Sequence, residues 1–262
     1  MVAAQYALMK KISLIMRVTV VATILSSILC LCMPAYAQSA VHVPYVGCKA
    51  DGQVGPINAP DEKNAIVKTT KPSPVGLVYY LAPDGLGVFA PQGWHCLETY
   101  GSDGSNLYVT PYPISFSAVF SDNFNGIPSY GVQLSQVYGD TSGRFDVAKV
   151  IARLFPSRWS FIRGVIAEGE EPASAFHNTP YSGDWLNYVN KNVVIYITDP
   201  NKQGLGTNSF LRKNMESIHG IVLLQGEVPD LVQLSARIPP SMSNLLPYMI
   251  HEVQLNYANP AQ

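Results

Sequence analysis

One short stretch of the chain gathers most of the side chains that could do chemistry. Residues 93–113 combine aromatic rings with an imidazole, two carboxylates and an amide around one cysteine, in the sequence GWHCLETYGSDGSNLYVTPYP. Aromatic faces beside a few polar groups are typical of small-molecule binding sites. The candidate binding residues are therefore Trp94, His95, Glu98, Tyr100 and Asp103.

A purely structural role explains the same stretch, and the sequence favours it. Trp94 and Tyr100 would cover a disulfide bond at Cys96. Residues 101–106 would simply turn, because Gly, Ser, Asp and Asn are the residues that turns prefer. The two interpretations differ in a way that a structure can test, since an active site needs its acid, base and imidazole to converge in one cleft.

The known catalytic and phosphate-binding motifs are missing from the sequence. The nearest approach to the G-x-S-x-G nucleophile elbow is IPSYG at 127–131, where Ile127 replaces the first glycine and Pro128 fixes φ before the serine. The Gly-Leu-Gly segments at 85–87 and 204–206 lack the third glycine of a dinucleotide-binding loop, and there is no P-loop lysine. We therefore predict no catalytic residues.

The histidines are spread along the chain in a way that predicts no metal site. No two of them lie within ligand range on one helix, and no H-E-x-x-H motif occurs. We expect neither a bound metal nor a cofactor. The five are His42, His95, His177, His219 and His251.

The first 37 residues have the pattern of a cleavable export signal. Basic residues precede an apolar run at 18–33, and Ala35 and Ala37 supply the small side chains of a signal-peptidase site. The run is short for a spanning helix, which needs about 20 apolar residues. We expect cleavage after Ala37 rather than a membrane anchor, and a periplasmic or secreted protein without a stable membrane span.

Loss of residues 1–37 removes three of the 17 basic residues and none of the 18 acidic ones, so the net charge falls from −1 to −4. A mildly acidic chain with no basic stripe lacks the electrostatic signature of a nucleic-acid-binding protein. The mature chain keeps 225 of the 262 residues. Its ordinary apolar fraction predicts a packed core rather than disorder.

Only two cysteines remain after cleavage, Cys48 and Cys96. In an oxidising compartment an isolated pair predicts a disulfide bond. Closing a loop of this length stabilises a protein by about 4 kcal/mol in the chain-entropy picture, less any strain. The alternatives are two free thiols, or a thiol nucleophile at Cys96 beside His95.

The spacing of apolar residues predicts an α+β fold: a single mixed-sheet domain at 75–262, preceded by an irregular, disulfide-stapled lead-in at 38–74. The lead-in is rich in Pro and Gly, and we expect at most one or two helical turns at 61–67. The i, i+3, i+4, i+7 spacing predicts two principal helices, at 144–155 and 245–255. Strands are predicted at 75–81, 86–89, 107–109, 114–120, 132–137, 193–198 and 220–224.

Several motifs carry a resemblance. The chain contains VPYVGC at 43–48 followed by DG and GP, then GLGVFAP at 85–91, GWHC at 93–96, and GS and LYVTP at 104–111. This pattern resembles a family of secreted or periplasmic bacterial proteins to which no activity is assigned. The resemblance implies export and a shared fold, and it implies no activity. The recurrence of both cysteine contexts in that family agrees with a Cys48–Cys96 bridge.

The hypothesis that follows is an exported envelope or periplasmic protein without catalytic activity. Its expected partner is a small molecule, a glycan or an envelope protein, and nucleic acid is excluded. The alternative is a secreted hydrolase with an unrecognised active site. Convergence of His95, Glu98 and Asp103 in a deep cleft would favour the hydrolase, and their dispersal would favour the binding protein.

Overall fold

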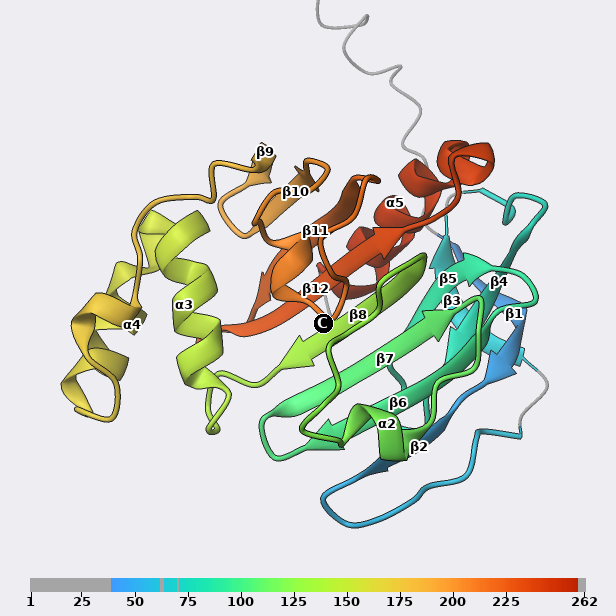
Figure 1. Ribbon diagram of the computed structural model, residues 1–262, viewed down its shortest axis with the longest axis horizontal. Coiled ribbons are helices and arrows are strands. Elements are labelled where there is room, and N and C mark those ends of the chain that lie inside the picture. Colours follow the sequence, from blue (N-terminus) through green and yellow to red (C-terminus); the bar gives the residue numbers. More distant parts are fainter. Residues whose placement is uncertain (1–38, 62–63, 70, 259–262) are drawn as a thin grey trace, which may run out of the picture. The chain divides into compact units, whose positions relative to one another are not determined.

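Two β-sheets run through the residues that the computed structural model describes, which are 39–61, 64–69 and 71–258 (Figure 1). The smaller sheet has the strand order β3-β1-β4-β5, and the larger has the order β2-β6-β7-β8-β12-β11-β10-β9. Parallel pairs β1–β4 and β2–β6 join otherwise antiparallel ladders. The expected α+β domain with mixed sheets is therefore confirmed.

The four strands of the smaller sheet are β1 (Ser39–Gly47), β3 (Asn64–Thr69), β4 (Leu77–Leu81) and β5 (Gly87–Pro91). The larger sheet contains β2 (Lys49–Gly52), β6 (His95–Gly101), β7 (Gly104–Thr110), β8 (Gly131–Val137), β9 (Asp184–Asn190), β10 (Val193–Thr198), β11 (Ile218–Gln225) and β12 (Asp230–Arg237).

The α-helices are α2 (Phe116–Val119), α3 (Arg144–Leu154), α4 (Trp159–Ala167) and α5 (Leu246–Tyr257). Short 3₁₀ helices are η1 (Pro156–Arg158), η2 (Ala173–Ala175), η3 (Gly206–Asn208) and η4 (Pro240–Leu245). Helices α3 and α5 confirm the two that the apolar spacing predicted. No helix among the described residues is long and apolar enough to cross a membrane. The predicted export signal and the predicted cleavage site after Ala37 lie outside the described residues.

The segment before residue 75 is more regular than the sequence indicated. It contains β1, β2 and β3, and the helical turns expected at 61–67 are wrong because Asn64–Thr69 is a strand. Pro44 made β1 look irregular. It lies where β1 changes partners, pairing with β3 up to Pro44 and with β4 from Tyr45 onward. A proline is tolerated there because the ladder is interrupted at that point.

The strand expected at 114–120 is also wrong, because this segment forms the short helix α2. Its apolar residues alternate as a strand's would, but Ser115 caps the helix by accepting a hydrogen bond from the Ala118 backbone N–H at 3.2 Å. Helix α4 and strands β6, β9 and β12 were also not predicted. Strand β12 is central, and its alternating Leu-Val-Gln-Leu-Ser pattern is the one that the site below depends on.

Apolar residues gather on both faces of the larger sheet. The main core lies between one face, the smaller sheet and α5, and it includes Tyr80, Leu107, Leu134, Leu234 and Met249. A second core packs α3 and α4 against the other face over β10, β11 and β12. A third, smaller core lies under the segment that contains α2. In Figure 1, α3 and α4 lie on the opposite side of the larger sheet from β1, β3, β4 and β5.

The disulfide between Cys48 and Cys96 is present, as the sequence predicted, with Cα atoms 5.3 Å apart. Cys48 lies between β1 and β2, where the chain passes from the smaller sheet to the larger one, and Cys96 lies in β6. The bridge therefore connects the junction of the two sheets to a strand of the larger sheet.

Candidate functional site

Three of the five candidate residues lie in β6, and they are distributed over both of its faces. Successive side chains of a strand point to opposite faces. Glu98 and Tyr100 therefore share the face of Cys96, whereas His95 lies on the other face and is exposed at the start of the strand. Trp94 packs against the main core, and its backbone N–H donates to the Tyr80 hydroxyl at 3.0 Å.

Asp103 lies at the far end of the same hairpin, in the turn between β6 and β7. The structure therefore does not bring His95, Glu98 and Asp103 together in one cleft. Tyr100 has a structural contact, because its hydroxyl donates to the Gly55 carbonyl at 2.5 Å. Of the five, only Asp103 lines the cleft described below.

Glu98 is a buried carboxyl group, with 1% of its surface exposed and no hydrogen-bond partner for Oε1 among the described residues. Burial raises the pKa of Glu98 to about 9, and a hydrogen bond to Asp84 and the negative charge of Asp84 raise it further. Glu98 is therefore protonated and neutral at pH 7. It faces the inside of the domain between the two sheets, with Leu107 opposite it on β7.

A cleft of about 340 Å³ opens on the α3 side of the larger sheet. Its floor is formed by β7, β8 and β12, one wall by α3, and the other by the segment that follows η3. Helices α3 and α4 cover the β10–β12 half of this face, and the α2 segment covers the region of Leu97 and Tyr108. The strands between the two covers carry polar side chains.

The floor of the cleft is arranged in rows across three strands. Asn106, Ser135 and Gln233 lie side by side in register on β7, β8 and β12. The next row, toward the turn of the β6–β7 hairpin, places Val137 beside Leu231. The floor thus passes from an uncharged amide and hydroxyl row to an apolar pair.

Backbone groups with fixed chemistry orient the amide side chains of the floor. The Phe210 backbone N–H donates to Gln133 Oε1 at 2.7 Å, so Gln133 Nε2 must be the end that points to Asn106. It donates to Asn106 Oδ1 at 3.1 Å, and the Ser135 hydroxyl donates to the same oxygen at 2.7 Å. Amide orientation is normally inferred from such networks. Here a backbone donor determines it for Gln133 and consequently for Asn106.

Gln233 is oriented in the same way by a backbone acceptor. Its Nε2 donates to the Leu205 carbonyl at 3.1 Å and also contacts the hydroxyls of Tyr196 and Ser235. The Tyr196 hydroxyl in turn donates to the Leu234 carbonyl at 2.9 Å. Burial raises the pKa of Tyr196 well above its ordinary value, so this hydroxyl stays neutral.

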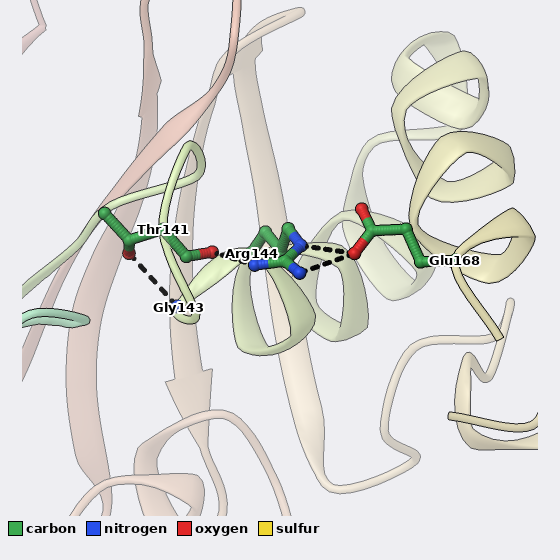
Figure 2. A network of polar contacts seen from close by, with 4 residues as sticks. All are labelled: Thr141, Gly143, Arg144 and Glu168. Atoms are coloured by element: carbon green, nitrogen blue, oxygen red, sulfur yellow. Dashed lines mark hydrogen bonds and ion pairs between the residues drawn. The ribbon is translucent and has the colours of Figure 1, made fainter. Parts of the chain in front are cut away.

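Two ion pairs join the α3 wall to the segment that follows α4. Arg144, at the start of α3, donates from Nε to Glu168 at the end of α4 at 2.6 Å, and from Nη1 to the Thr141 carbonyl at 2.7 Å (Figure 2). Lys149 lines the cleft and bonds Glu171 at 2.8 Å, which raises the pKa of the lysine. Partly exposed pairs of this kind contribute little stability, so their role here is to orient the wall.

The opposite wall is an aromatic cluster around Phe210. The Phe210 ring stacks on Tyr108 with centroids 5.4 Å apart and meets Phe124 edge-on at 5.2 Å. Its carbonyl accepts from the Ile127 N–H at 2.6 Å. Phe210 keeps 38% of its surface exposed at the cleft. The wall therefore presents a firmly held aromatic ring to the cleft.

Beneath this wall lies Arg237, which is 1% exposed. Its guanidinium donates to the carbonyls of Ser129 at 2.9 Å, Arg212 at 2.6 Å and Ile127 at 3.3 Å. Burial lowers the pKa of Arg237. A planar group with five donors can join several carbonyls at once, and here it joins the 127–129 loop to the segment that carries Phe210.

The sequence contains a signal for this site that motif searching missed. The tetrapeptide VQLS occurs twice, at 132–135 in β8 and at 232–235 in β12. These strands are antiparallel neighbours, with Gln133 opposite Ser235 and Leu134 opposite Leu234. In both copies the leucine faces the main core, and the glutamine and serine lie on the floor side. Two buried strands that each place Gln and Ser on one face indicate a polar lining, because unpaired amides are costly to bury.

The comparisons found no match: no family model, no curated protein and no solved structure is similar to this chain. We therefore infer the chemistry of the cleft from its geometry alone. Its lining contains serines but neither His nor Cys. Among the described residues, no group of three or more His, Cys, Asp or Glu side chains is placed to hold a metal ion.

Proposed function

We propose that this protein is exported to the bacterial envelope and binds a small uncharged glycan, without converting it, in the cleft between α3 and the Phe210 segment. The observation that carries this proposal is the floor of the cleft, where neutral amides and hydroxyls replace the apolar residues that cover the neighbouring strands. Small-ligand sites combine apolar and aromatic contacts with a few oriented polar groups, and this cleft places Val137, Leu231 and Phe210 beside the amides of its floor.

The charges at the cleft support an uncharged ligand. Lys149 is paired with Glu171 and Asp146, at 2.8 and 3.4 Å, so it offers little to an anion. The exposed Phe210 ring offers a flat apolar face, and aromatic side chains combine a large contact surface with low conformational freedom. Sugar rings present apolar C–H faces together with hydroxyl groups, and so they match both surfaces.

The hydrolase alternative has less support in this cleft. The Ser135 hydroxyl is hydrogen-bonded to an amide oxygen, and Ser209 donates to the Gly206 carbonyl. A serine nucleophile needs an adjacent base that takes its proton. No imidazole lines the cleft, so neither serine has such a base there.

Export is part of the proposal. The signal-like residues 1–37 and the Cys48–Cys96 bridge support it, because disulfides persist in oxidising compartments. Protein recovered from the periplasm of an expressing bacterium should begin at Gln38. Retention of the first 37 residues in the recovered protein would contradict export with cleavage.

Binding is tested on a panel of neutral glycans with the mature, oxidised chain and two variants. Asn208 is exposed and lines the cleft, so Asn208→Trp places a large ring at its rim, whereas Gln203 is exposed in the same loop but does not line the cleft, so Gln203→Trp is the matched control. We expect the wild type and Gln203→Trp to bind the same neutral glycan and Asn208→Trp to lose it. Equal binding by Asn208→Trp, or binding of charged glycans alone, would contradict the proposal.

A further inference from the structure

Two polar atoms in the floor of the cleft have no partner within the described residues. Gln133 and Ser135 both occupy Asn106 Oδ1, which leaves Asn106 Nδ2 as a donor without an acceptor in residues 39–61, 64–69 and 71–258. Gln233 Nε2 is occupied by the Leu205 carbonyl and by the hydroxyls of Tyr196 and Ser235. This leaves Gln233 Oε1 as an acceptor without a donor in the same residues. Both residues line the cleft.

The chemical identity of these two atoms is determined by the backbone. The Phe210 N–H can only donate and the Leu205 carbonyl can only accept, so neither amide can be reversed without losing a hydrogen bond. The floor therefore presents one fixed donor, on β7, and one fixed acceptor, on β12. Ser135 on β8 lies between them, and two strand spacings separate their Cα atoms by roughly 10 Å.

We infer that the ligand of this cleft carries an acetamido group, as an N-acetylhexosamine does. This inference rests on the proposed function and specifies it. A secondary amide is planar and trans, so its C=O and N–H point in opposite directions. Its carbonyl can accept from Asn106 while its N–H donates to Gln233, which satisfies both floor atoms with one rigid group.

The surroundings of the donor and acceptor fit the rest of such a sugar. The acetamido methyl group needs an apolar contact, and Val137 and Leu231 form the adjacent row of the floor. Val150 of α3 completes this apolar end. The sugar ring can then lie against Phe210 at the opposite wall. A simple hexose offers hydroxyls to the floor but leaves the apolar row uncovered.

The test compares N,N′-diacetylchitobiose with cellobiose, which share a β-1,4-linked glucose skeleton and differ at the 2-acetamido groups. Calorimetric titration of the mature wild-type chain should show binding of diacetylchitobiose that is at least about tenfold tighter than that of cellobiose, the effect of about one well-placed hydrogen bond. This comparison requires no substitution, so it does not depend on the folding of a variant.

The donor is tested with Asn106→Asp. Aspartate keeps the oxygen that accepts from Gln133 and Ser135 and replaces the free N–H donor with a second oxygen. We expect this variant to bind diacetylchitobiose at least about tenfold more weakly than the wild type. The control is Asn187→Asp, which adds the same charge on the exposed strand β9, and it should bind as the wild type does.

The outcomes separate this inference from the proposed function. Equal affinity for the two sugars, or undiminished binding by a folded Asn106→Asp, would overturn the acetamido inference and leave glycan binding intact. Binding of a different neutral glycan without binding of diacetylchitobiose would do the same. Failure of every neutral glycan on the panel would overturn both.

Discussion

At the scale of single residues, the polar groups of the cleft floor respond to pH differently from the buried carboxyl group of Glu98. The amides of the cleft floor are uncharged at every pH and hold their hydrogen bonds throughout. Glu98 is an ionisable group in the interior, with Oε1 unpartnered among the described residues. Its protonation is therefore coupled to folding, whereas the floor of the cleft contains no ionisable side chain.

The sign of this coupling follows from the raised pKa. The folded chain holds the Glu98 proton up to pH of about 9, whereas the unfolded chain releases it near the ordinary value of 4.5. The resulting stabilisation is fully present below pH 4.5 and is lost as the pH rises toward 9. The loss amounts to at most about 1.4 kcal/mol per pH unit within that window.

Glu98→Gln removes this dependence while keeping the shape of the side chain. We expect the free energy of unfolding of the wild type to fall, relative to that of the variant, between pH 6 and pH 9 in urea titrations. Glu227→Gln, at an exposed turn position, removes one carboxylate without burial and should follow the wild type. Parallel pH profiles for the wild type and Glu98→Gln would show that Glu98 ionises freely in the folded protein.

At the scale of elements, the sequence predicted what depends on local periodicity. Helices α3 and α5 follow from their apolar spacing, and β10 and β11 from continuous apolar runs. Strand β1 and helix α2 were misassigned because pairing and capping decided them. The effect of Pro44 depends on which strand lies beside it, and the effect of Ser115 depends on a hydrogen bond to Ala118.

The candidate site likewise depends on tertiary neighbours that local sequence patterns do not reveal. The 93–113 stretch concentrates reactive side chains in sequence, but alternation along β6 sends them to opposite faces. The polar row of the cleft floor takes one residue each from β7, β8 and β12, and Gln233 is 98 positions from Ser135 in the chain. Only the repeated VQLS segments indicated it, and their significance depends on the two strands being neighbours.

The disulfide is the element-scale feature with the clearest energetic consequence. It fixes the crossing between the two sheets to β6. The Cys48→Ser/Cys96→Ser double variant should be less stable by about 2–4 kcal/mol, because the unfolded chain regains the freedom of a long loop. Amide exchange should increase first in β1 and β2 and only later in α3, which packs in a separate core. Unchanged exchange in β1 and β2 would contradict this role.

At the scale of the whole domain, the two faces of the larger sheet differ: one is packed in the main core and the other carries the cleft. One face packs against the smaller sheet and α5 and forms the main core. The other face carries two separate covers, α3 with α4 and the α2 segment, and the cleft lies where neither cover reaches. Ligand binding at this position needs no rearrangement of the main core. We therefore expect binding to stabilise the domain without changing its secondary structure.

The most direct test of this account is to map ligand contacts by NMR on the isotope-labelled mature chain. Titration with a neutral glycan that the panel identifies should shift backbone amide signals in β7, β8 and β12 and in residues 206–210, and should shift the side-chain amide signals of Asn106 and Gln233. Signals of α5 and of the smaller sheet should stay unchanged. Shifts confined to the exposed edge strand β9, or to the region of His95 and Trp94, would contradict the assignment of this cleft as the binding site.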